Sequence, residues 1–279
     1  MNGLFRNVLS LSSATTLTGS ARLTNFNPDH LLFYVDGGSS AVTLAELKKI
    51  IVTVNFKNSK GAGVSVAANL PLDMIANLND YLAGNGTFGS ETKAAFALDI
   101  GKICLRSDDE ITLDISTATT LTNALSLTIK AVDSRIGKEQ IISYKYVEAS
   151  ASQAYQQSDV LAVFAAITSP SDAVVITTDD YFGSNNVTEI AVCAYGAAFG
   201  CAENVDNFGP VWEDDTHLSQ PVTVRAGSAN ERFLFKTWVF DQNRIGMSRT
   251  EFDMARNYGK SIAQSNPVKA KCLNYYYTK

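Results

Sequence analysis

The residues with the greatest chemical potential in this sequence are two histidines and three short acidic clusters. His30 precedes an apolar segment and is expected at a strand edge or in a core, whereas His217 follows an acidic run in a polar segment. Carboxylate oxygens are the ligands that calcium prefers in proteins. The clusters therefore supply a set of candidate calcium ligands, namely Asp108, Asp109, Asp179, Asp180, Asp214 and Asp215.

Calcium is the one cofactor that the sequence suggests, and a simpler interpretation of the acidic clusters competes with it. None of the three clusters has the regular spacing of an EF-hand loop. Solvated turns between strands are the simpler explanation. If a cluster does bind calcium, we expect neighbouring subunits to share the ion.

Signatures of enzymatic chemistry are missing from the sequence. It contains no nucleophile elbow, Walker A loop, dinucleotide fingerprint or helical metalloprotease motif. An enzyme on a cupin-like jelly roll usually needs a histidine-rich metal set, which two distant histidines supply poorly. We therefore expect a protein that is not an enzyme.

The four cysteines, at positions 104, 193, 201 and 272, lack the paired spacing of a zinc site. Three of them lie in apolar or strand-like segments, where cysteine behaves as a small hydrophobic residue. We expect all four to be buried thiols, which fits synthesis in a cytoplasm.

The composition narrows the classes of partner. Apolar residues make up 46% of the 279 residues and charged residues only 18%, below the usual share of about a quarter, so contacts between subunits are plausible. The net charge is −5, and the longest basic cluster is Lys48-Lys49. Since a protein that coats nucleic acid directly shows a basic face, we expect no direct nucleic-acid contact.

Strand patterns dominate the sequence, which predicts an all-β fold. Segments of alternating or β-branched residues occur in both halves of the chain. In the first half they cover 30–35, 49–56, 94–100, 110–116, 125–132 and 141–147. In the second half they cover 160–167, 173–177, 187–195, 222–225, 232–240 and 268–277.

Each half also carries one amphipathic helix. The first is predicted over 70–82, with Asn69 as its N-cap and Pro71 in the first turn, and the second begins near Ser248 in a capping box. The Ser/Gln/Ala-rich segment 149–158 is the best boundary. We predict an N-terminal arm at 1–19, a first domain at 20–149 and a second at 150–279.

The N-terminal arm is expected to lie outside the first domain. Its apolar residues Leu4, Phe5, Val8 and Leu9 can share one helical face, so we expect them to contact a neighbouring subunit or a membrane surface. A disordered tail is the alternative. No segment of the chain reaches the roughly 20 apolar residues that a membrane-spanning helix needs.

The order of these elements resembles that of a known family. The first half runs through HLLFYVD at 30–36, ELKKIIVTVNF at 46–56, the helix LPLDMIANLNDYL at 70–82 and the strand AAFALDI at 94–100. The chain closes on AKCLNYYYTK at 270–279. With its near-equal halves, the chain resembles the major capsid proteins of tailless, membrane-containing icosahedral bacteriophages of the corticovirus type.

The resemblance implies a double jelly roll, made of two tandem β-sandwiches, each with a short helix. It also implies a virion shell of homotrimeric, pseudo-hexameric capsomers that contact neighbouring capsomers, vertex or spike proteins and an internal membrane. The rival hypothesis is a receptor- or carbohydrate-binding β-sandwich of a viral spike or adhesin. That hypothesis predicts exposed aromatic residues in one loop region, for which Trp212 is the candidate.

Overall fold

The structure is a computed structural model that describes most of the first 166 residues and separate segments after them. The described ranges are 4–59, 61, 63–83, 91–134, 140–150, 153–166, 175–179, 187–191, 208–213, 220–226, 231–239 and 250. The chain divides into two compact units, Met1–Tyr146 and Val147–Lys279. This division lies close to the boundary that we predict after residue 149.

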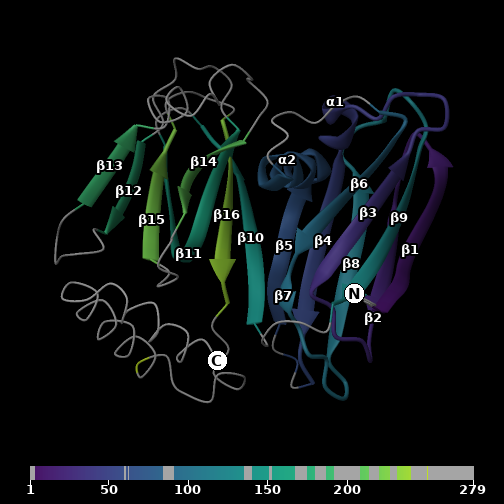
Figure 1. Cartoon of the computed structure of the whole chain (residues 1–279), viewed down its shortest axis with the longest axis horizontal. Coiled ribbons are helices and arrows are strands. Elements are labelled where there is room, and N and C mark those ends of the chain that lie inside the picture. The colour runs from purple at the N-terminus through teal and green to yellow at the C-terminus, as the bar shows by residue number, and fades with distance from the viewer. Residues whose placement is uncertain are drawn as a thin grey trace. The chain divides into compact units, whose positions relative to one another are not determined.

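The first unit consists of strands with two short helices between them (Figure 1). Its elements in chain order are β1 (Leu4–Ala14), β2 (Gly19–Leu23), β3 (His30–Asp36), α1 (Leu44–Leu47), β4 (Ile50–Lys57), β5 (Gly63–Pro71), α2 (Leu72–Ala83), β6 (Lys93–Asp99), β7 (Gly101–Lys102), β8 (Glu110–Thr117), β9 (Leu125–Asp133) and β10 (Gln140–Glu148), the last of which continues past Tyr146. Every strand predicted in this half is present, with bounds shifted by a few residues.

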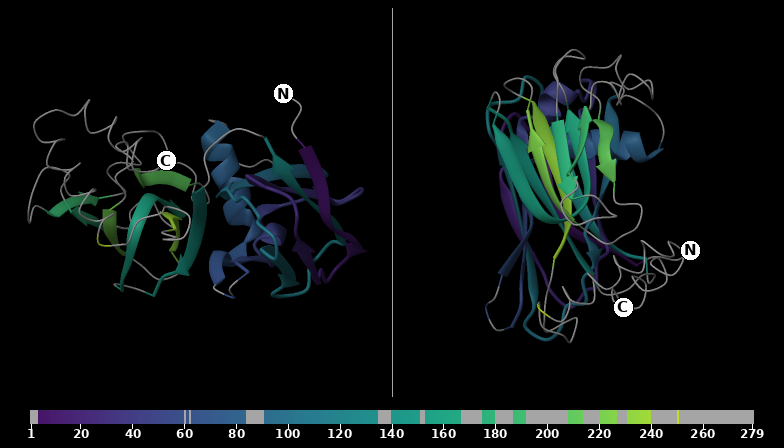
Figure 2. Two further views of the ribbon diagram at one scale, coloured as in Figure 1. Left: turned by 90° about the horizontal axis from the view of Figure 1, so that it is seen from below. Right: turned by 90° about the vertical axis from the view of Figure 1, so that its left-hand side faces the viewer.

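Strand pairing in the first unit is nested. The first strand pairs with the last of the motif (β1 with β9), β2 pairs with β8, β3 with β6, and β4 with β5, all antiparallel. Pairings of β3 with β9 and of β4 with β8 join these hairpins into two sheets, ordered β1-β9-β3-β6 and β5-β4-β8-β2. A long antiparallel ribbon folded into two sheets in this way is a jelly roll. The two sheets are seen from two further directions in Figure 2.

The core of this unit lies between its two sheets. In β4, β8 and β9, alternate residues are buried and their neighbours are more exposed, because successive side chains of a strand point to opposite faces. Phe33 in β3 and Phe56 in β4 are among the largest fully buried side chains. Each such ring contributes on the order of 1.5–3 kcal/mol through removal of its surface from water.

The predicted N-terminal arm is wrong for the described residues 4–14. These residues form β1, which pairs with β9 from Leu4 opposite Asp133 to Ala14 opposite Leu125. The segment is therefore the first strand of the jelly roll and part of the sandwich, whereas we expected it to lie outside the first domain. The segment does not form a helix, because a short isolated helix is only marginally stable. Pairing with β9 instead gives its backbone groups hydrogen-bond partners along the strand.

Helix α2 ends at Ala83, one residue beyond the predicted end, but it begins at Leu72, two residues later than predicted, and its start is made differently. Asn69 does not cap it: this residue belongs to β5 with φ of 48°, and its backbone N–H donates to Thr53 Oγ1 at 3.2 Å. Pro71 ends β5, and the helix starts at Leu72. The first two turns of α2 are buried, where the helix contacts α1, β4, β5 and β6.

The second unit is described through six strands, β11 (Ala154–Ala166), β12 (Val175–Asp179), β13 (Val187–Ala191), β14 (Phe208–Glu213), β15 (Gln220–Arg225) and β16 (Arg232–Trp238). The long strand β11 pairs with β15 along its first half and with β14 and β16 along its second half. Strand β12 pairs with both β13 and β15.

The core of the second unit is built on these pairings. Its buried cluster includes Val160 and Val163 from β11, Val222 and Val224 from β15, and Phe233 and Phe235 from β16. Strand β11 already begins at Ala154, so part of the Ser/Gln/Ala-rich segment predicted as a boundary is strand. The predicted helix near Ser248, except Thr250, and the closing strand at 268–277 lie outside the described residues.

In fold class the chain is as predicted, mostly strands with few short helices. None of the helices in the described ranges is long and apolar enough to span a membrane. Cys104 is a half-buried thiol, and the other three cysteines lie outside the described residues.

Candidate functional site

Strand β1 carries all four of the predicted contact residues. Opposed residues of an antiparallel pair lie on the same face of a sheet, so their partners in β9 show where they point. Phe5 is opposite Val132, on the outer face of the sheet, whereas Leu9 is opposite the buried Ile129, on the inner face. The helical pattern predicted that Phe5 and Leu9 share one face, but in the structure they lie on opposite faces of the sheet.

A β-bulge explains this distribution. The register of β1 against β9 shifts between Asn7 and Leu9, so Val8 has no residue directly opposite it. An extra residue of this kind exchanges the two faces of a strand beyond it. The side chains before the bulge are the exposed ones: Leu4 is 46% exposed and Phe5 61% exposed, and they belong to the three exposed large hydrophobic residues of the described chain.

Beyond the bulge, β1 packs against β2 of the other sheet. A methyl group on Gly19 would lie 2.7 Å from Leu11 Cδ2 and 3.3 Å from Leu9 Cδ1. The leucine side chains thus occupy the space that any larger residue at this position in β2 would need. This close approach holds the second half of β1 against the sandwich, while its outer edge carries no strand among the described residues.

The opposite edge of the same sheet is closed. At β6, the side chain of Asn79 in α2 satisfies both backbone groups of Ala97: Nδ2 donates to Ala97 O at 2.6 Å, and Ala97 N–H donates to Oδ1 at 2.8 Å. Asn79 Nδ2 also donates to Ile75 O at 2.8 Å. The amide acts as a substitute strand residue, so α2 blocks further strand pairing at this position. Sequence reasoning placed Asn79 in the helix but gave it no role.

The outer face of this sheet carries a groove of about 670 Å³ beside α2, with Tyr34 and Thr128 in its lining. Lys130 lies over the Tyr34 ring, 5.2 Å from its centroid, and the Lys93 ammonium pairs with Asp36 at 3.2 Å. The lining therefore combines one half-covered aromatic ring with an internally paired carboxylate.

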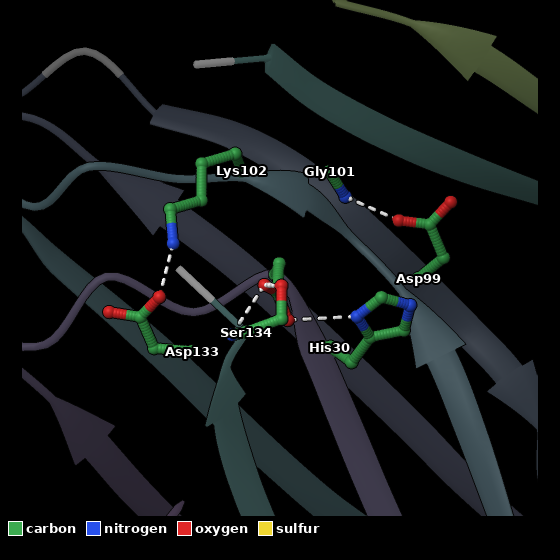
Figure 3. Close-up of polar contacts among 7 residues, drawn as sticks. His30, Asp99, Gly101, Lys102, Asp133 and Ser134 are labelled. Carbon is green, nitrogen blue, oxygen red and sulfur yellow. Dashed lines mark hydrogen bonds and ion pairs between the residues drawn. The ribbon is translucent and has the colours of Figure 1, made fainter. Parts of the chain in front are cut away.

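A polar cluster lies at the end of this sheet where β3 begins and β9 ends (Figure 3). The buried carboxylate of Asp29 accepts hydrogen bonds from the backbone N–H and the hydroxyl of Ser134, and its Oδ1 lies 2.8 Å from His30 Nδ1. Burial acts to raise the pKa of Asp29, but the bonds from Ser134 and His30 outweigh it and hold the pKa below its usual value of 3.8.

This cluster contains serine, histidine and aspartate, but not in an order that activates a nucleophile. In a catalytic triad the imidazole lies between the hydroxyl and the carboxylate and takes the hydroxyl proton. Here the Asp29 carboxylate lies between Ser134 and His30. The geometry instead ties the residue after β9 to the residue before β3.

Neighbouring contacts secure the same end of the unit. Lys102 pairs with Asp133 in a largely buried ion pair, and Asp99 Oδ1 accepts from Gly101 N–H at 2.9 Å. Burial, with a smaller effect of the Asp99 charge, raises the pKa of Tyr144 well above its usual value of 10. These contacts join the strand ends at this side of the unit.

The candidate metal ligands Asp108 and Asp109 lie in the turn before β8. Asp109 is buried, and its two oxygens accept backbone N–H groups: Oδ1 from Ser59 at 2.9 Å and Oδ2 from Arg106 at 3.1 Å. Asp108 has φ of 67°, a conformation that aspartate tolerates in turns. The geometry shows Asp109 as the residue that closes this loop.

Of the remaining candidates, only Asp179 belongs to the described residues. Asp179 ends β12 in the second unit, and Asp180, Asp214 and Asp215 lie outside the described residues, as does His217. The described part of the chain holds no group of three or more His, Cys, Asp or Glu side chains placed to bind a metal. Trp212, the aromatic candidate of the rival hypothesis, lies in β14 opposite Val163.

Comparison with known proteins finds likeness in structure alone. No family model matches the chain, and no curated protein matches it by sequence. The major capsid protein P2 from Bacteriophage PM2 is similar in structure, with a TM-score of 0.50 and 11% identity, over 87% of this chain and 99% of that one. A protein in the atomic structure of Sulfolobus Turreted Icosahedral Virus is similar over 98% of this chain and 99% of that one, with a TM-score of 0.55 and 12% identity.

Both likenesses extend over both units, and the nested strand pairing of the first unit agrees with them. The chain therefore has the double jelly-roll fold of these viral proteins.

Proposed function

We propose that this chain is the major capsid protein of a tailless, membrane-containing icosahedral bacteriophage, and that it forms the virion shell as trimeric, pseudo-hexameric capsomers. The observation that carries the proposal is the likeness to a major capsid protein over 87% of this chain and 99% of that one. A partial match would fit any protein that contains one jelly roll. A match across both units fits a protein whose whole length forms the shell subunit.

The physical features of the described residues support a structural role. Three chains with two jelly rolls each would present six similar walls, which allows a trimer to tile like a hexamer. The polar cluster at Asp29 joins two strand ends, and that at Asp109 closes a turn. Function in such a protein resides in surfaces, because the interior of the sandwich is filled by apolar side chains.

The acidic balance supports a shell that does not touch the genome. With a net charge of −5 and no basic cluster beyond two lysines, the sequence does not show the clustered cationic groups typical of a protein that neutralises phosphates directly. We infer that an internal membrane separates the shell from nucleic acid, and that the partners are neighbouring capsomers and vertex or spike proteins.

The experiment that tests the proposal is light scattering combined with electron microscopy of the purified full-length protein. We expect a mass of three 30.1 kDa chains that persists on dilution, and pseudo-hexagonal particles in negative stain. A protein with the mass of one chain at all concentrations, and without hexagonal particles, would contradict the proposal.

A further inference from the structure

We propose that the open edge of β1 pairs with the β1 edge of a second copy of this chain, antiparallel and about a two-fold axis. The inference rests on the proposed function, since it names one contact through which shell subunits meet.

The first argument is the backbone of β1. This strand has eleven residues and pairs only with β9 among the described strands, so the backbone groups on its other side have no strand partner there. Proteins usually protect such an edge with proline, lysine, other charges or bulges. Strand β1 has the bulge at Val8, but it contains no proline, lysine or acidic residue.

The single charge in β1 is already engaged. Arg6 Nη1 donates to Thr24 O at 2.6 Å, within the same unit. The guanidinium is thus held toward the loop after β2. An approaching strand meets a neutral ladder, and such an edge favours pairing with another strand.

The second argument is the contrast between the two edges of the sheet. At the β6 edge, α2 and the Asn79 side chain take the backbone groups of Ala97. At the β1 edge, the described residues supply no such cap, and Leu4 and Phe5 are exposed next to it. The fold therefore directs any strand pairing of this sheet to β1.

The third argument is charge, and it selects a second copy as the partner. The chain is acidic overall, yet residues 1–28 contain no Asp or Glu, and the first acidic residue is Asp29. Two copies that pair through β1 therefore bring no carboxylates from β1 itself into the contact. The basic residues of this segment are only Arg6 and Arg22, too few for a nucleic-acid partner.

A two-fold arrangement follows from the use of one strand by both copies. An isologous contact places the same patch on both sides of the axis, and an antiparallel pair of identical strands has such an axis at one residue position. Around this axis, each copy would cover the exposed Leu4 and Phe5 of the other copy, or the part of β1 that follows them.

The test is disulfide trapping along β1 in the full-length protein. Cysteine is introduced singly at Asn7, Val8, Leu9, Ser10 and Leu11, and dimers are quantified after mild oxidation on non-reducing gels. The unsubstituted protein measures the background of the native cysteines. The matched control is Ala95→Cys, an exposed position on β6 at the other edge of the same sheet.

We expect the dimer yield to peak at one β1 position, several-fold above Ala95→Cys, and to fall on both sides of it. Yields at all five positions no higher than the control would overturn the inference, as would mass-spectrometric linkage of these cysteines mainly to sites outside β1. A second measurement needs no substitution: backbone amides of residues 4–14 should exchange hydrogen more slowly as protein concentration rises, and unchanged exchange in an oligomer would also overturn it.

These results separate the inference from the proposed function. Trimers and particles without β1 linkage would leave the shell function intact and refute the β1 contact. A β1-linked dimer in a protein that forms neither trimers nor particles would support the contact and refute the shell.

Discussion

Replacement of Asn79 by alanine should destabilise the first unit far more than an ordinary surface substitution. The side chain makes three hydrogen bonds, two with the backbone of Ala97 and one with Ile75 O. Its loss leaves the N–H and C=O of Ala97 without their partner at the edge of β6. Neither group can turn to β3, because both point toward α2.

The magnitude follows from the burial of these groups. A buried backbone group that loses its partner costs about 1–3 kcal/mol, and a satisfied hydrogen bond contributes about 1 kcal/mol. Ala97 is only half-buried, so water can compensate in part and the low end applies to each group. With the bond to Ile75 added, we expect a loss of about 2–3 kcal/mol in the free energy of unfolding.

The assay is urea unfolding of Asn79→Ala, with Asn7→Ala as the matched control. Asn7 is exposed, and the hydrogen bonds of its side chain are with Ser10, so its replacement should cost less than about 0.5 kcal/mol. For a unit of this size the Asn79 variant should melt roughly 4–12 °C lower. If the two variants unfold at the same urea concentration, the Asn79 amide does not hold the β6 edge and our argument is wrong.

Three further predictions concern backbone, pH and metal. Gly101→Ala should lose most of the folded protein on expression, because its new Cβ would lie 2.2 Å from Gln140 O, whereas Gly38→Ala, at a similar positive φ with open space around it, should cost only about 1–2 kcal/mol. Asp29→Asn should flatten the acid limb of the stability curve: the folded pKa of Asp29 is depressed, so its contribution is present above the usual value of 3.8 and is lost as pH falls through the lower folded value. A variant whose stability falls with acid as steeply as the parent's would refute that role. Calcium should raise the melting temperature of assembled particles more than that of isolated subunits, and equal melting with and without chelator would mean that the acidic clusters only form turns.

Strong alternation made most of the first unit predictable from sequence. In β4, β8 and β9 every second residue is apolar, and each of these strands has one face on the core. Helix α2 was predictable for the same reason, since its apolar residues recur at helical spacing. The first half of the helix is buried. A pattern that repeats along a whole element identifies that element without knowledge of its neighbours.

Strand β1 was misinterpreted because its pattern is irregular. The bulge at Val8 breaks the alternation, so Leu4, Phe5, Val8 and Leu9 take the spacing of a helical face. Only the presence of β9, more than a hundred residues later, decides between the two structures. Likewise, the polarity of Asn69 suggested a helix cap, whereas in the structure it bonds to Thr53 across a strand pair.

The contacts of the candidate site also depend on distant residues. Asn79 and Ala97 come together through the fold, as do Ser134 and Asp29, and local patterns do not indicate such pairs. The sequence could therefore show that β1 is apolar and poor in charge. That the β6 edge is closed and the β1 edge is open became visible only in the structure.

The nested pairing of the first unit also sets an order of events during synthesis. Strand β1 is made first, yet its partner β9 is the last strand of the nested set, with Leu4 opposite Asp133. At about 5–20 residues per second, the ribosome takes roughly 6–25 s to reach residue 133 after residue 4. Throughout this interval the N-terminal strand is a nascent segment with Arg6 as its single charge and with no ladder to join. A newly made chain is thus most prone to premature association through the strand that its completed sheet leaves at the edge.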